Sequence, residues 1–256
     1  MAESPSGGYL KDSDFPWKGQ PDEVACNLAL GNLANNLPAR VTVDGRIHAE
    51  TYLTVCGVIA GFAAQRSLFA RVAESNDDAI LGQIHVATTK NGEKLFFGDP
   101  LNFMLIGTPD VAANERLWPL AAGGAVAAGL DAAHIPKLGD MFGHVSSTIG
   151  GEEEGMPSVP RKNFPHVAPK ELLRLFWPLA AMCFAGQLPG VTSQFGAAAP
   201  RFWPAITGYV ANKVIRDVSG VVDPRTSLII LMETAIYASK LDPVIVNSQP
   251  PEAGTA

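Results

Sequence analysis

Residues 47–72 read IHAETYLTVCGVIAGFAAQRSLFARV and contain no proline. Their apolar side chains recur at helical spacing, and the middle of the segment, residues 53–64, carries no charge. A helix on the surface of a protein needs a polar face, so a helix that lacks one is expected to be buried. We therefore predict that this segment is the central helix of the fold.

Two glycines lie one helical turn apart on this segment, at Gly57 and Gly61. Glycine in the interior of a helix costs about 1 kcal/mol relative to alanine, so a pair of them needs a reason. The pair predicts that the backbone of another helix crosses the central helix at close range.

The composition of the chain suggests that part of its surface is covered by another copy. Charged residues make up 17% of the 256 residues, whereas about 25% is typical of a soluble domain. Fewer charges leave less polar cover for the surface of a protein this large. We therefore expect a homo-oligomer.

Charge and cysteine content exclude several classes of protein. The net charge of −6 argues against a nucleic-acid partner, and the densest basic spot is only Arg161-Lys162. The three cysteines share no spacing typical of a metal site. The N-terminus is polar, without an apolar signal region, and no apolar run reaches the roughly 18 to 20 residues that a membrane span requires. We expect a cytoplasmic protein that binds neither nucleic acid nor membrane.

The rest of the chain predicts a mainly α, multi-helix globular domain with one β-hairpin. Residues 80–98 carry the hairpin signal, because Asn91-Gly92 separates two β-prone runs. Residues 1–22 are expected to form a flexible or loosely docked arm, residues 23–247 a single domain, and residues 248–256 a disordered tail.

Local signals give further expectations about where helices begin and end. Pro38 is expected to end a first helix that starts at Glu23. Asp44-Gly45 could form a hairpin turn, but we favour Asp44 as the cap of the central helix. Asp99 is expected to cap another helix, with Pro100 at its first position.

No short motif for nucleotide binding, zinc proteolysis or an esterase nucleophile is present in the sequence. One constellation remains, on the helix predicted from Pro136 to Ile149. Asp140 and His144 lie one turn apart on this helix, and His134 precedes it. An aspartate and a histidine at this spacing can ligate a metal ion, or the carboxylate can orient the imidazole as a general base. The alternative is a solvated pair on an exposed helix.

Residues 150–169 form a long segment with four prolines and three glycines. A segment of this length without regular structure is usually a lid, a binding loop or a linker. We expect an ordered arm that lies across the body of the protein or across a neighbouring subunit. A lid that presents Arg161, Lys162 and His166 to an anionic ligand is the sharper hypothesis, and a surface linker is the simpler one. Asp99 and Asn102 could line a pocket.

Two classes of function stay open on this basis. The first is an oligomeric protein that binds a small ligand or a protein partner without catalysis, using ligand-binding candidates Asp99, Asn102, Asp140, His144, Arg161, Lys162 and His166. The second is a metal-assisted hydrolase that uses His134, Asp140 and His144, with residues 150–169 as its lid. The absence of catalytic motifs favours the binding protein, and the sequence leaves the cofactor unknown.

Overall fold

The computed structural model of the chain describes residues 15–43, 45–75, 77–188 and 195–247, and these residues are mainly helical. This confirms the predicted fold class. The helices run in the order α1 (Glu23–Arg40), α2 (Ala49–Ser75), α3 (Asp78–Leu81), α4 (Asp99–Ile106), α5 (Leu117–Ala127), α6 (Leu138–Thr148), α7 (Pro169–Phe184), α8 (Trp203–Asp217), α9 (Pro224–Ala238) and α10 (Pro243–Asn247).

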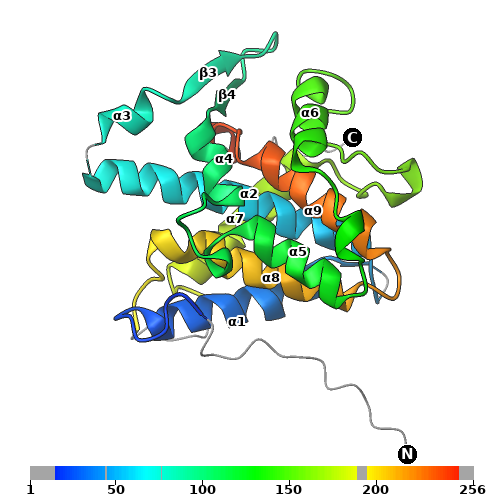
Figure 1. Cartoon of the computed structure of the whole chain (residues 1–256), viewed down its shortest axis with the longest axis horizontal. Coiled ribbons are helices and arrows are strands. Elements are labelled where there is room, and N and C mark those ends of the chain that lie inside the picture. Colours follow the sequence, from blue (N-terminus) through cyan, green and yellow to red (C-terminus); the bar gives the residue numbers. More distant parts are fainter. Residues whose placement is uncertain (1–14, 44, 76, 189–194, 248–256) are drawn as a thin grey trace, which may run out of the picture.

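Helix α2 runs through the middle of the molecule, with α7, α8 and α9 packed around it (Figure 1). Every residue from 49 to 65 on this helix is buried. The burial follows from the sequence, because an uncharged circumference is stable only when other elements cover all of it. The prediction of a buried central helix is confirmed.

The two glycines of α2 lie where α9 crosses it. A Cβ atom added at Gly61 would lie 2.7 Å from the carbonyl carbon of Ala235 and 2.8 Å from its Cα atom. A Cβ atom at Gly57 would collide with the carbonyl oxygen of Leu231 and with the side chain of Thr234. The predicted close crossing is therefore confirmed, and the partner is α9.

The same helix bears on the expectation about membranes. Within the described ranges, α2 is the one helix long and apolar enough to cross a bilayer, with a mean hydropathy of 1.4 over 18 residues. The expectation that no apolar run is long enough to span a membrane is therefore wrong by length and composition. However, 83% of this window is buried inside the fold. A buried core helix of a globular protein can be equally long and apolar.

The predicted hairpin is present, although it is shorter than the segment that predicted it. Strand β3 (His85–Thr88) pairs antiparallel with β4 (Lys94–Phe97), while residues 78–81 belong to helix α3. The hairpin projects from the helices (Figure 1). Leu95 is held against Leu241 by an isolated β-bridge, and the Phe96 amide donates to the Lys240 carbonyl at 2.8 Å. These contacts give the hairpin the support that two strands need.

A second, smaller hairpin corrects one expectation. Strand β1 (Thr42–Val43) pairs antiparallel with β2 (Arg46–Ile47), and Gly45 between them has a φ of +74°. Helix α2 begins only at Ala49, five residues after the position expected to cap it. Asp44 itself lies outside the described residues.

Two other helix boundaries differ from expectation. Helix α1 continues past Pro38 to Arg40, because a proline in the last turn removes only one backbone hydrogen bond and the helix ends directly afterwards. Helix α4 has Gly98 rather than Asp99 at its N-cap, and no side chain caps it.

The first described residues are docked on the helical body. Trp17 is fully buried, and its indole nitrogen donates to Asn27 at 2.8 Å. Phe15 stacks on Trp17 and meets the edge of Tyr209. Residues 15–22 are thus fixed to α1 and α8; residues 1–14 and the predicted tail at 248–256 lie outside the described part of the chain.

Candidate functional site

The proline-rich segment 150–169 lies across the helical body as an arm. On α9, the buried carboxylate of Glu233 accepts hydrogen bonds from the backbone amide of Ser158 at 2.5 Å and from its hydroxyl at 2.6 Å. The Tyr237 hydroxyl donates to Glu154 at 2.6 Å. Burial raises the pKa of Glu233, whereas the bonds from Ser158 and the nearby His144 oppose the shift.

The second half of the arm is fixed to the start of α2. Asn163 donates to Glu50 at 2.9 Å, and the His166 amide donates to the Thr51 hydroxyl at 3.0 Å. The ring of His166 stacks on that of His48 with their centroids 3.5 Å apart. Burial lowers the pKa of His48, and the adjacent His166 adds to that effect. This segment is therefore a docked arm within one chain.

The structure does not bring the three candidate metal ligands together. His134 is exposed beside Asp131, and Asp140 is exposed on α6. His144 makes a 2.9 Å hydrogen bond between its Nε2 atom and the Met156 carbonyl. In the described part of the chain, no three His, Cys, Asp or Glu side chains converge as a metal site would require. The metal centre stays a prediction without a geometric counterpart there.

The basic candidates on the arm face outward and do not converge. Arg161 is exposed and pairs with Glu153 at 3.0 Å, and Lys162 is also exposed. His166 is occupied by its stack on His48. No anion site is formed by these three side chains.

The two candidates on α4 have separate surroundings. Asp99 lines a shallow surface cavity beside Gln83 and His85. Asn102 lies deeper, with its side-chain oxygen 3.4 Å from the ammonium group of Lys240. That lysine is 3% exposed, and burial lowers its pKa to about 8.

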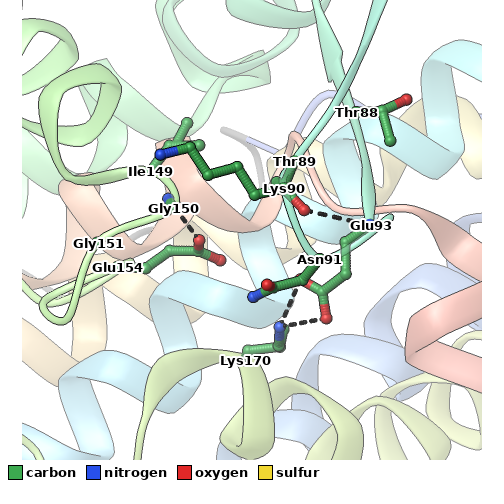
Figure 2. A pocket seen from close by; sticks show the side chains of 10 residues that line it. All are labelled: Thr88, Thr89, Lys90, Asn91, Glu93, Ile149, Gly150, Gly151, Glu154 and Lys170. Atoms are coloured by element: carbon green, nitrogen blue, oxygen red, sulfur yellow. Dashed lines mark hydrogen bonds and ion pairs between the residues drawn. The ribbon is translucent and has the colours of Figure 1, made fainter.

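A pocket with a volume of about 590 Å³ lies between the tip of the β3–β4 hairpin and the start of the arm. Figure 2 shows Lys170 reaching Glu93 across this pocket, at 2.7 and 2.8 Å. Glu154 on the opposite wall accepts from the Gly150 amide at 2.7 Å and from Tyr237. These charged groups already have partners within the chain, so none of them needs a ligand to neutralise it or to complete its hydrogen bonds.

A smaller hollow contains a buried hydrogen-bond donor that the described residues do not satisfy. Two adjoining chambers, of about 290 and 160 Å³, share three lining residues, Arg71 on α2, Met104 on α4 and Arg116 just before α5. We call this space the arginine hollow. The guanidinium of Arg71, at its mouth, has no hydrogen bond or ion pair with any described residue.

Arg116 is the buried member of the pair. Its side chain is only 13% exposed, and its Nε atom is buried without a hydrogen-bond acceptor. One terminal nitrogen donates to the carbonyl of Glu115 at 3.0 Å, and the Glu115 carboxylate lies 3.8 Å away. Burial lowers the pKa of Arg116, and the positive charge of Arg71 contributes to the lowering. An anion between the two guanidinium groups would give the Nε–H group of Arg116 an acceptor and would offset the repulsion between the two positive charges.

Sequence reasoning missed the arginine hollow because its residues are far apart in the chain. Arg71 lies beyond the uncharged core of α2, and Arg116 stands alone before a tryptophan-proline pair. Only the packing of α2, α4 and α5 brings them together. The one available signal was an arginine directly before an otherwise uncharged helix.

The chain is thus a mainly helical protein with a hollow lined by two arginines. Comparison of the chain with protein-family models, with curated proteins and with solved structures finds no match. Function is therefore argued from the chemistry of the site.

Proposed function

We propose that this protein binds a small organic anion in the arginine hollow without catalysing a reaction on it. The observation that carries the proposal is the buried Nε–H group of Arg116, which has no acceptor in the described part of the chain. Leaving a buried donor unpaired costs about 1–3 kcal/mol, and more when the group is charged. A bound carboxylate or phosphate would supply the missing acceptor.

The second arginine supports the same conclusion. Arg71 and Arg116 carry like charges close enough to influence each other, and Arg71 has no carboxylate partner among the described residues. Two guanidinium groups that face one hollow are the arrangement that proteins use to bind carboxylate and phosphate groups. Ligand binding would replace repulsion with charge-assisted hydrogen bonds.

The metal-assisted hydrolase is the alternative proposal, and it has less support. It needs His134, Asp140 and His144 around one ion, and the described geometry offers no such convergence. The arginine hollow is lined by the carboxylates of Asp110 and Glu115 and by the hydroxyls of Ser67 and Thr108, and no histidine is among its described lining residues.

Substitution of Arg116 by glutamine is expected to abolish anion binding. In a thermal-unfolding screen at pH 7.5 with 10 mM acetate, benzoate, phosphate or phenyl phosphate, we expect at least one anion to raise Tm of the wild type by about 2 °C or more. The Arg116→Gln variant should lose most of that shift, because the buried donor is gone.

The matched control is Arg225→Gln, which removes the same charge from an exposed position at the start of α9. This variant should respond to the anions as the wild type does. The proposal would be refuted by a wild type that none of the four anions stabilises, or by an Arg116→Gln variant that keeps the full shift.

We also propose that the protein is a homo-oligomer in solution, on the strength of its low content of charged residues. Size-exclusion chromatography with light scattering at micromolar concentration is expected to give a mass of at least two chains. A mass of 27.0 kDa, that of one chain, would remove this proposal.

A further inference from the structure

The two chambers of the arginine hollow differ in chemistry. Five of the ten residues that line the larger chamber are apolar, namely Pro100, Phe103 and Met104 of α4 together with Ile80 and Val111. Its volume of about 290 Å³ exceeds the roughly 150 Å³ that is enough to hold a benzene ring. A ligand head held by the arginines therefore has room for a compact apolar body beside it.

One positive charge in the hollow, that of Arg71, has no ion pair among the described residues. Three arginines line the chambers, namely Arg71, Arg116 and Arg201. The carboxylate of Glu115 lies 3.8 Å from Arg116, and the carboxylate of Asp22 lies 3.3 Å from Arg201. A ligand head with one negative charge matches the charge of Arg71, whereas a dianion would exceed it.

Arg201 is also engaged elsewhere. Its guanidinium lies 3.3 Å from the carboxylate of Asp22 and 4.6 Å from the centre of the Phe202 ring. It is 61% exposed, so its charge is screened by solvent. Arg71 and Arg116 are thus left as the two groups that bind the head.

The carboxylate of Asp110 disfavours a second negative group on the ligand. This exposed carboxylate lines the larger chamber near enough to Arg116 to interact with it electrostatically, and a hydrogen bond from Thr108 lowers its pKa, so it is charged at neutral pH. A second negative group placed in that chamber would meet a like charge. The chamber therefore favours an apolar end over an anionic one.

On the basis of the proposed anion site, we infer that the ligand is an amphipathic monocarboxylic acid, with its carboxylate between Arg71 and Arg116 and a compact apolar body in the larger chamber. Benzoate represents this class. Its ring would contact Phe103 and Met104, and its carboxylate would accept from the Nε–H group of Arg116.

The inference predicts a definite order of affinities. Each apolar CH₂-sized group that leaves water strengthens binding by up to about fourfold. Benzoate should therefore bind at least tenfold more tightly than acetate, which has the same head and almost no body. Inorganic phosphate leaves the apolar chamber filled with water, and terephthalate places a second carboxylate near Asp110. Both should bind at least tenfold more weakly than benzoate.

Isothermal titration calorimetry of these four anions, with wild-type protein at pH 7.5, tests the order. Phosphate or terephthalate binding as tightly as benzoate, with all binding lost in Arg116→Gln, would overturn the inference and leave the anion site standing. Acetate binding as tightly as benzoate would likewise overturn the inference and leave the anion site standing. Absence of binding by every anion would overturn both the inference and the proposed function.

A substitution in the apolar wall tests the contribution of the ligand's apolar body separately from that of its carboxylate. Phe103 is 43% exposed, so Phe103→Ala is expected to fold. It should weaken benzoate binding at least fivefold and leave acetate binding within twofold of the wild type. Equal losses for both ligands, or no loss for benzoate, would show that the apolar chamber does not hold the body of the ligand.

Discussion

Replacing Gly61 with alanine is expected to destabilise the protein by at least about 3 kcal/mol. The new methyl group would overlap the backbone of Ala235 on α9, with the carbonyl carbon 2.7 Å away. A backbone cannot rotate out of the way as a side chain can, so α2 and α9 would have to separate. Because native domains are stable by only about 5–15 kcal/mol, this is a large part of the total. Urea unfolding followed by circular dichroism measures the loss.

The matched control for this substitution is Gly31→Ala. Gly31 lies inside α1, and a Cβ atom there would have no neighbour within 4 Å. Since alanine favours the helix, this variant should be more stable than the wild type by about 0.5–1 kcal/mol. A Gly61→Ala protein as stable as the wild type would contradict the close crossing of the two helices.

Replacing Lys240 with methionine is expected to stabilise the protein at pH 7 by about 1–3 kcal/mol. The lysine is 3% exposed and has no carboxylate partner among the described residues. Its ammonium group lies 5.3 Å from the ring of Phe97 and 5.8 Å from that of Phe142, which offsets part of the cost of burial. Methionine has a similar length and carries no charge to bury.

The gain from this substitution should depend on pH in a definite direction. Burial lowers the pKa of Lys240 from 10.5 to about 8 in the folded protein. Between these values the unfolded chain binds a proton that the folded chain does not, so the stability of the wild type rises with pH. The advantage of Lys240→Met should be full below pH 8 and should disappear as the pH approaches 10.5.

Urea unfolding of both proteins at several pH values between 6 and 10 measures this difference. Lys213→Met is the control, because Lys213 is exposed on α8 and pairs only with Asp217. It should change stability by no more than about 0.5 kcal/mol at any of these pH values. A Lys240→Met protein that is less stable than the wild type at pH 7 would show that the buried charge is stabilising.

The sequence predicted the parts of the fold that depend on local pattern. An uncharged helical segment specifies burial whatever covers it, and a glycine pair specifies a close neighbour, so α2 and its crossing were predictable. The identity of that neighbour was not, because α9 is distant in the chain and several helices are equally apolar. Helix ends were predicted less well where a proline or an aspartate has two common roles, as at Pro38 and Asp44.

The candidate site was largely beyond the sequence for the same physical reason. The segment 150–169 was recognised from its prolines as a possible arm, and it is docked on α2 and α9. Of its charged residues, Glu154 accepts from Tyr237 of α9, whereas Arg161 and Lys162 are exposed. The buried donor without an acceptor is the Nε–H group of Arg116, and a donor loses its acceptors only through the packing around it, which no local pattern records.

The most direct test of the arginine hollow as a ligand site is a crystal structure of the protein grown with benzoate. We expect density for one benzoate in the hollow, with a carboxylate oxygen about 2.7–2.9 Å from the Nε atom of Arg116 and the ring against Phe103. A hollow that holds only water at a benzoate concentration that saturates binding in solution, or benzoate bound at another place, would contradict the proposal.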